Sequence, residues 1–285
     1  MKVVVASGKG GTGKTLVATQ LSRFLEGGGE RVSYVDADVE TPNGHLLLAP
    51  SDISTWPVTV RTPSLKRGQC AGHGACQAAC AFHAILSAKG KIIVFDELCH
   101  SCGACLLACP DDALTETSRV VGRIQQGLVG RMAFFSGQLN VGEARATPVI
   151  DAVMQRVADT RDDWTIVDAP PGVACGAVAA VKGADLVLLV AEPTPFGQHD
   201  LALAIEMCRA LALDPAVILN RADLGDRGVY RLLERTGVPM VAGIPFDQEI
   251  ATAYASGELT SASIPALTEA LTDIAAYLRS KRGQS

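Results

Sequence analysis

Short runs of apolar, β-branched residues recur along the chain, separated by stretches whose apolar positions have helical spacing. The first run spans 2–6, and similar runs follow at 164–168, 184–191 and 216–220. Continuous apolar runs of this length are typical of strands that are buried on both faces of a parallel sheet. Segments 200–212 and 228–236 have the helical pattern. This alternation predicts an α/β fold with a doubly wound, mostly parallel sheet.

The alternation breaks in the first half of the chain. From Pro63 to Glu116 the sequence becomes turn-rich, and it holds seven of the nine cysteines, all between positions 70 and 109. We therefore predict two domains. Residues 1–62 and 117–285 form the parallel-sheet domain, and residues 63–116 form a small α+β domain inserted into it.

Composition narrows the class of protein. The chain of 285 residues has a formal charge of -5 and a pI near 5.6, so it offers no basic field for nucleic acid. No apolar run approaches the roughly 20 residues that span a bilayer, and the amino terminus lacks a signal-peptide pattern. We expect a cytoplasmic protein with no membrane partner. Cysteines in such a chain indicate metal binding rather than disulfides.

A glycine-rich motif follows the first apolar run directly. Residues 8–15 read GKGGTGKT, which matches the P-loop pattern G-x-x-x-x-G-K-[ST], and an apolar helical segment comes next. The glycines allow backbone N–H groups to surround a phosphate, Lys14 reaches the outer phosphates, and the Thr15 hydroxyl ligates Mg²⁺. The alternative is a glycine-rich turn that binds nothing.

The motif carries a second lysine, Lys9, and so resembles the deviant Walker A loop of the MinD, ParA and nitrogenase iron-protein superfamily. The resemblance implies a dimer in which Lys9 reaches the partner's phosphates; the alternative is a solvated surface lysine. It also implies that Asp38 positions the attacking water, that Asp168 holds Mg²⁺, and that Asn220 reads the adenine edge. Lys9, Lys14 and Asp38 are then the catalytic residues, and the nucleotide-binding set is Gly8, Gly10, Gly11, Thr12, Gly13, Lys14, Thr15, Gly172 and Asn220.

The cysteine-rich segment has the spacing of bacterial ferredoxins. Four cysteines at 99–109 follow the pattern C-x2-C-x2-C-x3-C-P, in which three thiolates hold one 4Fe-4S cluster and the fourth crosses to another. The upstream segment repeats it at an offset of 29 residues (Cys70 to Cys99, Cys76 to Cys105, Cys80 to Cys109). Crossed ligation then assigns the first cluster to Cys80, Cys99, Cys102 and Cys105, and the second to Cys70, Cys76, Cys109 and His73. A zinc site is the alternative.

His73 occupies the position where the repeat predicts a cysteine, and Ala81 replaces the usual proline. Three interpretations stay open. His73 ligates iron and raises the potential of that cluster, or three thiolates hold a 3Fe-4S cluster, or the site has decayed and His73 is a loop residue. His83 and His100 fit no ligand spacing and are expected to be loop residues.

The combination resembles MinD-superfamily ATPases with an inserted ferredoxin domain. From the motifs we infer an ATP-gated electron carrier with ATP, Mg²⁺ and iron-sulfur clusters, acting on a redox or iron-sulfur client protein. An iron-sulfur carrier of the Mrp type is the alternative, although the carboxy-terminal C-x-x-C of those carriers is absent. A positioning ATPase would need a terminal amphipathic helix, and we expect 267–282 to pack on the sheet instead. Cys175 and Cys208 are expected in the core.

Overall fold

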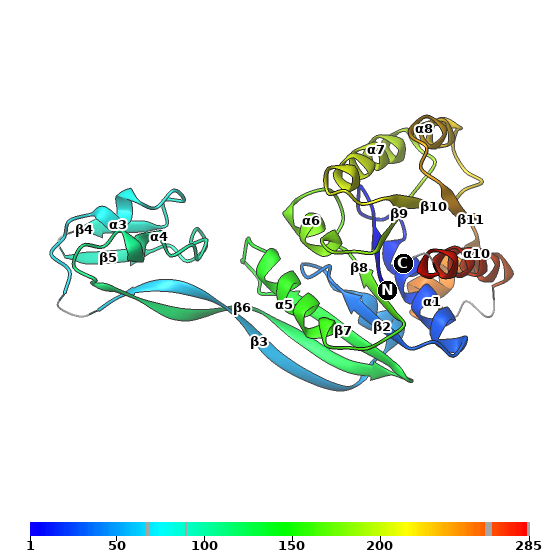
Figure 1. Ribbon diagram of the computed structural model, residues 1–285. Helices are drawn as coiled ribbons and strands as arrows, with labels where there is room; N and C mark the ends of the chain where they lie inside the picture. Colours follow the sequence, from blue (N-terminus) through cyan, green and yellow to red (C-terminus); the bar gives the residue numbers. More distant parts are fainter. Residues whose placement is uncertain (67–68, 89, 260–263, 284–285) are drawn as a thin grey trace.

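The computed structural model describes residues 1–66, 69–88, 90–259 and 264–283. A twisted sheet of nine strands forms the centre, in the order β11-β10-β9-β1-β8-β2-β7-β6-β3 (Figure 1). Neighbouring strands from β11 to β7 are parallel, whereas β6 and β3 are antiparallel to their neighbours. The predicted α/β fold with a mostly parallel sheet is therefore confirmed. The strands are β1 (Lys2–Ala6), β2 (Val32–Asp36), β3 (Ser51–Leu65), β6 (Leu114–Val129), β7 (Met132–Leu139), β8 (Trp164–Asp168), β9 (Leu186–Ala191), β10 (Pro215–Asn220) and β11 (Met240–Ile244).

Two hydrophobic cores lie on opposite faces of the sheet. Along β1, Val3 and Val5 face one core while Val4 and Ala6 face the other, as the two-residue period of a strand requires. One core is covered by α1 (Lys14–Gly27), α2 (Gly44–Leu48), α9 (Gln248–Ser256) and α10 (Pro265–Arg282). The other is covered by α5 (Thr147–Ala158), α6 (Cys175–Val181), α7 (Pro195–Ala210) and α8 (Gly228–Thr236).

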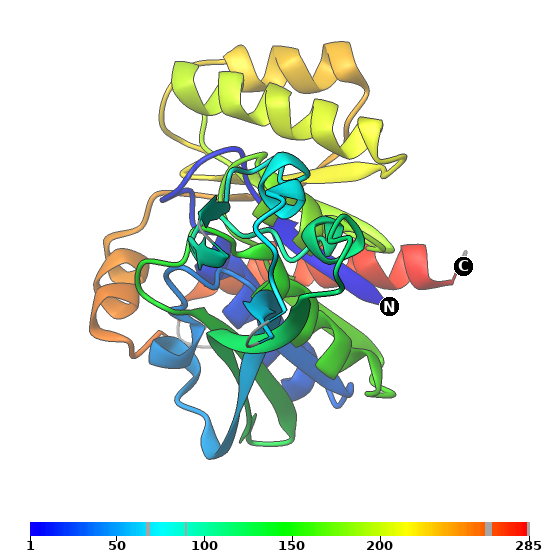
Figure 2. The ribbon, with the colours of Figure 1, turned by 90° about the vertical axis from the view of Figure 1, so that its left-hand side faces the viewer.

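Strands β3 and β6 leave the sheet as a long two-stranded ribbon that carries a small unit at its far end (Figure 1). The unit contains the hairpin β4 (Ile85–Ala88) and β5 (Lys91–Val94) and the short helices α3 (Ala75–Ala78) and α4 (Ala104–Leu107). We call this part, residues 66–113, the cysteine-rich unit. Figure 2 views the molecule with this cyan and teal unit toward the reader, in front of the body.

The cysteine-rich unit repeats its own structure at the offset of 29 residues. Helices α3 and α4 begin 29 residues apart, after Gly74 and Gly103 at φ 73° and 75°. The pairing of Ile85 with Val94 in the hairpin is matched by that of Leu65 with Leu114 at the end of the ribbon. The regular strands β3 and β6 thus extend past positions 63 and 116, where the sequence suggested that the turn-rich segment begins and ends.

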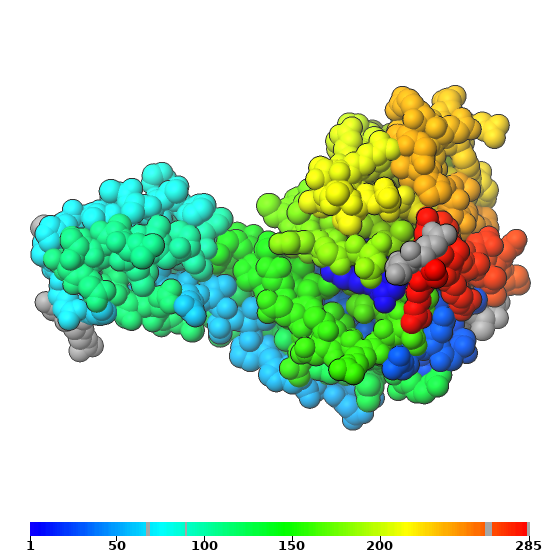
Figure 3. Space-filling model, viewed as in Figure 1, coloured from blue at the N-terminus to red at the C-terminus, as the bar shows by residue number. Residues whose placement is uncertain are grey.

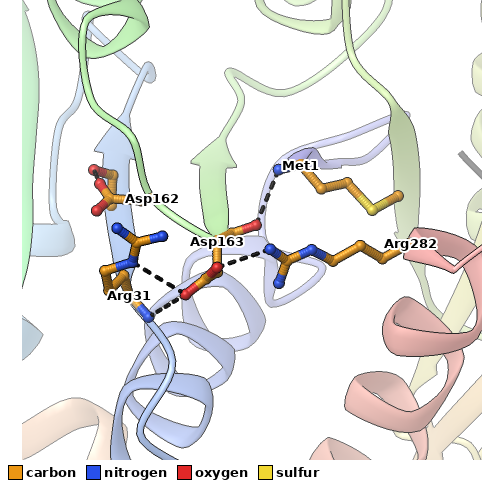
Figure 4. Close-up of polar contacts among 6 residues, drawn as sticks. Met1, Arg31, Asp162, Asp163 and Arg282 are labelled. Atoms are coloured by element: carbon orange, nitrogen blue, oxygen red, sulfur yellow. Dashed lines mark hydrogen bonds and ion pairs between the residues drawn. The ribbon is translucent and has the colours of Figure 1, made fainter.

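Met1 and the end of α10 are both fastened to the turn before β8. The Met1 ammonium donates to the Asp163 carbonyl at 2.9 Å, and the Asp163 carboxylate contacts Arg282 at 2.7 Å and the Arg31 amide at 3.0 Å (Figure 4). Arg282 lies at the end of α10, whose apolar side is buried against α1 and β11. The expectation that 267–282 packs on the sheet is confirmed. Among the described residues, none of the helices has the length and hydrophobicity needed to cross a membrane.

The two cysteines outside the cysteine-rich unit differ. Cys208 is fully buried in α7, as expected, and burial raises the pKa of its thiol to about 11. The expectation that Cys175 is a core residue is wrong, because its side chain is exposed. Cys175 is the first residue of α6, where the chain enters the helix from an exposed turn, and the buried face of α6 starts at Ala177.

Candidate functional site

The loop between β1 and α1 lies at the carboxyl edge of the parallel strands and needs its glycines. Gly11 and Gly13 have φ values of 78° and 98°, which side chains rarely adopt. A Cβ atom on Gly8 would lie 2.1 Å from the carbonyl oxygen of Asp200, so a side chain has no room there. The shape of the loop therefore requires glycine at positions 8, 11 and 13.

A cavity of about 430 Å³ opens beside this loop, within the range of roughly 300–1,000 Å³ typical of small-molecule sites. Seven of the predicted nucleotide-site residues line it: Gly10, Gly11, Gly13, Lys14, Thr15, Asp38 and Asn220. Other predicted residues lie outside its wall, namely Gly8, Lys9, Thr12, Asp168 and Gly172. The Gly172 amide donates to the Ser7 carbonyl at 2.9 Å, so this glycine stays tied to the loop.

The opposite wall comes from residues that the sequence did not single out. They follow β10 and β11 and include Arg221, Pro245, Phe246, Asp247, Ile250 and Tyr254. The sequence could have indicated these residues. They follow strand β11, Asp247 caps α9, and polar residues after a parallel strand lie at the ligand-binding edge of the sheet. Asn220, predicted to read adenine, donates from Nδ2 to the Thr12 carbonyl at 2.8 Å and so supports the loop.

Two buried aspartates end the adjacent strands β2 and β8. Asp36 and Asp168 are partners in the sheet register and are fully buried. Asp36 accepts hydrogen bonds from the amides of Gly44 (2.8 Å), Asn43 (3.0 Å) and Asp38 (3.2 Å). Asp168 accepts from the Tyr34 hydroxyl at 3.4 Å through Oδ2, whereas its Oδ1 has no partner with hydrogen-bond geometry among the described residues.

The electrostatics of the pair favour a cation. Burial, and then the charge of Asp168, raises the pKa of Asp36 well above its ordinary value. Burial also raises the pKa of Asp168 to about 6, against the opposing influence of Thr15 and Lys14. A buried carboxylate oxygen without a partner, close to a hydroxyl, is the donor chemistry that Mg²⁺ prefers. The residues present therefore fit the predicted magnesium site at Thr15 and Asp168.

Asp38 lies on the wall of the same cavity, two residues beyond Asp36. Its Oδ1 accepts from the Thr41 hydroxyl at 3.4 Å, and its carbonyl accepts from the Thr41 amide at 3.1 Å. Burial raises the pKa of Asp38, and the charge of Lys14 opposes that rise. This carboxylate borders the nucleotide-sized space, as the sequence predicted for Asp38, while Asp36 hydrogen-bonds the backbone of the turn.

Lys9 forms a small ionic network that the sequence did not predict. Its ammonium lies 3.3 Å from Glu192 Oε2, and Arg221 Nη1 contacts Glu192 Oε1 at 2.5 Å. The Glu192 side chain is 10% exposed, whereas that of Lys9 is 32% exposed. Glu192 follows β9 directly and so reaches the edge of the sheet at which the loop lies. Lys9 is held by a contact within its own chain and is partly open to solvent.

The first predicted cysteine set comes together in the cysteine-rich unit. Cys80, Cys99, Cys102 and Cys105 all line one small cavity of about 20 Å³, which the rings of Phe82 and His100, stacked 3.7 Å apart, also border. The thiols of Cys99 and Cys102 lie close enough to influence the pKa of Cys105, which burial raises. Cys80, from the other half of the repeat, is thus grouped with the downstream cysteines.

The second set also gathers, although less completely. Burial raises the pKa of Cys76, and the neighbouring thiols of Cys109 and Cys70 raise it further. His73 Nδ1 lies 3.0 Å from Asp111 Oδ2, which also accepts from the Ala71 amide at 3.3 Å.

The sulfurs of the two sets also accept backbone hydrogen bonds. The Ala84 amide donates to Cys80 Sγ and the Ala113 amide to Cys109 Sγ, both at 3.3 Å. These donors occupy equivalent positions of the repeat. Over the part of the chain that the structure describes, no three or more His, Cys, Asp or Glu side chains are arranged to hold a metal ion. A four-iron cluster binds its thiolates at separate iron atoms, so it does not require them to converge on one point.

Comparisons with known proteins agree with the nucleotide-binding part of this description. Residues 3–260 match the family profile described as the CobQ/CobB/MinD/ParA nucleotide binding domain. An uncharacterized protein of Methanocaldococcus jannaschii is 29% identical over 260 residues, which cover 90% of each chain. An uncharacterized ATP-binding protein of the same organism is 23% identical over 262 residues, covering 90% of this chain and 78% of its own.

Solved structures share the fold. The septum site-determining protein MinD of Pyrococcus horikoshii, solved with Mg-ADP, matches with a TM-score of 0.62 at 18% identity, covering 97% of this chain and 95% of its own. A ParA family ATPase of Chlorobium tepidum matches with a TM-score of 0.57 at 17% identity, covering 96% and 98%. At these identities the likeness establishes the fold alone.

Proposed function

Because the chain belongs to the CobQ/CobB/MinD/ParA nucleotide-binding family, we propose that it is a Mg²⁺-dependent ATPase that couples its nucleotide state to electron transfer through ferredoxin-type iron-sulfur clusters. The observation that carries the redox part is the grouping of Cys80 with three downstream cysteines around one cavity. That grouping matches the crossed ligation that the cysteine spacing predicts. Residues 63–116 then act as the inserted iron-sulfur domain.

The nucleotide chemistry is assigned to the loop and to the acidic strand ends. Lys14 and the backbone N–H groups of residues 10–15 bind the phosphates, and Thr15 and Asp168 hold Mg²⁺. Asp38 faces the cavity and orients the attacking water, while Gly172 lies where the loop meets the turn after β8. Asn220 fixes the loop through Thr12 and stands beside the space for the base.

Two cysteine sets hold the iron-sulfur groups in this proposal. Cys80, Cys99, Cys102 and Cys105 bind the first cluster, and Cys70, Cys76 and Cys109 with His73 bind the second. The contact between His73 and Asp111 supports a ligand role, because metal-binding histidines usually donate their other ring N–H to a carboxylate or carbonyl. Bound 4Fe-4S clusters would supply one-electron transfer.

The proposal includes a dimer of the chain with itself or with a close relative. Lys9 sits in the deviant loop with a third of its side chain exposed, so it is placed to leave Glu192 and contact a second protomer. Closing of the dimer around bound nucleotide would change the surroundings of the glycine-rich loops of both protomers together. A redox client protein would then bind one nucleotide state of the dimer in preference to the other.

A second candidate function is delivery of iron-sulfur clusters to other proteins. The exposure of Cys102, one of the four cysteines around the cavity, favours it, because an exposed ligand is open to exchange with a client thiol. A positioning ATPase has less support. The apolar face of α10, which a membrane anchor would need free, is buried against the body.

The test begins with anaerobic purification and counts of iron and acid-labile sulfide. Crossed ligation predicts that Cys80→Ser removes the same cluster signal in electron paramagnetic resonance as Cys99→Ser, although Cys80 lies in the upstream segment. Cys208→Ser is the matched control and should leave both signals intact. A protein purified without iron or sulfide would contradict the redox proposal and leave the ATPase assignment standing.

Redox titration with and without Mg²⁺ and a slowly hydrolysed ATP analogue separates the two candidates. An electron carrier gated by nucleotide should show a midpoint potential or a line shape that changes with the analogue. Signals indifferent to nucleotide, together with transfer of iron to an apo-ferredoxin, would instead establish the delivery function.

A further inference from the structure

One arginine connects the cysteine-rich unit with the body of the molecule. Arg119, on β6, places Nη1 2.6 Å from Glu143 Oε2, and its Nη2 donates to the Asp96 carbonyl at 3.1 Å. Glu143 belongs to the loop between β7 and α5, whereas Asp96 lies in the cysteine-rich unit, three residues before Cys99. Figure 3 shows the unit extending from the body, with green body surface facing its teal atoms.

Within the body of the molecule, a chain of contacts runs from the nucleotide site toward the loop that holds Glu143. Val39 follows Asp38, and its carbonyl accepts a hydrogen bond from the Leu139 amide at the end of β7, at 2.8 Å. The contact is close, because a Cβ atom on Gly137 would lie 2.6 Å from a methyl carbon of Val39. The end of β7 is therefore tied to the Asp38 segment by a backbone hydrogen bond and by close packing.

The loop between β7 and α5 is hydrogen-bonded to β6 at the point where the ribbon leaves the sheet. The Asn140 amide donates to the Val121 carbonyl at 2.9 Å, and its side chain donates to the Val120 carbonyl at 3.1 Å. Val121 is the extra residue of a bulge, since Val58 pairs with Gly122 and the next residue of β3 pairs with Val120. A β-bulge fixes the local bend of a ribbon. Because the loop binds β6 at this bulge, it holds the direction in which the ribbon leaves the sheet.

Glu143 is buried in this loop, with 2% of its side chain exposed. Its amide donates to the Asn140 carbonyl at 3.1 Å, and Arg145 Nε lies 3.6 Å from its other carboxylate oxygen. The contact with Arg119 is an ion pair whose angles fall outside hydrogen-bond geometry. A buried carboxylate depends on its cationic partners, so we expect Arg119 and Arg145 to stay paired with Glu143 when it moves.

On the other side, Arg119 holds the turn that presents the first cysteine of the downstream motif. The Asp96 carbonyl accepts both from Arg119 and from the Cys99 amide, the latter at 3.3 Å. Arg119 Nε also lies 4.0 Å from Asp96 Oδ1. A shift of the guanidinium therefore acts on the same oxygen that orients Cys99.

We propose that Arg119 is a positioning residue that couples the nucleotide site to the Cys99 cluster ligand. When nucleotide moves the Asp38 segment, β7 and the Glu143 loop move with it, and Arg119 carries the displacement to the Asp96 turn. This inference rests on the proposed function for its redox consequence. The mechanical coupling itself is a property of the polypeptide and is measurable without reference to iron.

The experiment is hydrogen exchange by mass spectrometry on the anaerobically purified full chain, with and without Mg²⁺ and a slowly hydrolysed ATP analogue. In the wild type, peptides covering 96–105 should change their exchange rate about threefold or more with nucleotide. Arg119→Gln should abolish that change while nucleotide affinity stays within about twofold. Arg119→Lys should also abolish it, because one ammonium cannot hold Glu143 and the Asp96 carbonyl together.

Arg123→Gln is the matched control, since Arg123 lies on the same strand but contacts Gln138 of the body, at 3.0 and 2.6 Å. It should keep the wild-type response. A nucleotide response that survives in both Arg119 variants, or that is absent from 96–105 in the wild type, would overturn the proposal.

Iron-loaded protein gives a second readout. A nucleotide-dependent line shape in electron paramagnetic resonance should be present in the wild type and lost in Arg119→Gln. Absence of iron from wild-type protein would defeat the proposed redox function instead, and the exchange measurement would still decide the coupling.

Discussion

Glu192 gives the most direct test of how Lys9 is used. Its side chain is nearly buried and holds Lys9 at 3.3 Å and Arg221 at 2.5 Å. If Lys9 crosses to a partner when nucleotide closes the dimer, the contact with Glu192 has to break first. Glu192→Gln keeps the shape of the side chain and removes its charge, so it should release Lys9 and favour the dimer.

The structure sets the size of this effect. Lys9 is one-third exposed, so its ion pair is worth about 1 kcal/mol, the upper end of the range for surface pairs. A homodimer breaks this contact once in each protomer, about 2 kcal/mol in all, so removing it should lower the dissociation constant of the dimer about thirtyfold. The same change loses the charged contact with Arg221, so the free energy of unfolding should fall by about 2 kcal/mol.

The assay is analytical ultracentrifugation at saturating Mg²⁺ and a slowly hydrolysed ATP analogue, with urea denaturation of the protomer in parallel. Arg221→Gln serves as the control, because it weakens the same network but leaves Lys9 paired. Since Arg221 also lines the nucleotide cavity, the analogue is raised until this variant is saturated too. It should lower stability without tightening the dimer. Dimerisation of Glu192→Gln that equals or falls below that of the wild type would refute the idea that Glu192 restrains Lys9.

Other substitutions test separate parts of the molecule. Lys14→Ala should weaken nucleotide binding at least tenfold in calorimetry, because it removes a charged contact to phosphate. His73→Cys should lower one midpoint potential by about 100 mV or more and leave the other unchanged, if imidazole ligates iron. Asp163→Asn should lower the free energy of unfolding by about 1 to 2 kcal/mol at pH 7 in urea denaturation. The arginines at Asp163, Arg282 first, hold the pKa of that carboxyl well below its usual range. Its stabilisation is therefore complete above about pH 4 and is lost as the pH falls further, so wild type and Asp163→Asn should converge in acid.

The sequence predicted what depends on local spacing. The glycine loop could be placed because its pattern, the strand before it and the helix after it are contiguous. The repeat of 29 residues likewise predicted that Cys80 belongs with the downstream cysteines, and these four side chains line one cavity. Both features follow from the order of residues over short distances, which a pattern records directly.

Features that depend on packing between distant segments could not be predicted in this way. Glu192 and Asp36 look like ordinary strand-end acids in the sequence, and only burial and their partners distinguish them. The exposure of Cys175 depends on how α6 meets the turn before it. The length of the ribbon was hidden because its strands alternate in polarity and lack the continuous apolar runs that identified the parallel strands.

For coupling to the nucleotide site, the place of the insertion in the sheet matters more than its distance from that site along the sequence. Strand β7 is the parallel neighbour of β2, whose end carries Asp36 and leads into Asp38, and β6 is the next strand along. The ribbon that holds the cysteine-rich unit therefore starts two strands from the nucleotide site. Two backbone hydrogen bonds, those made by the Leu139 and Asn140 amides, connect the Asp38 segment with β6, and they are the route by which we expect a displacement to pass.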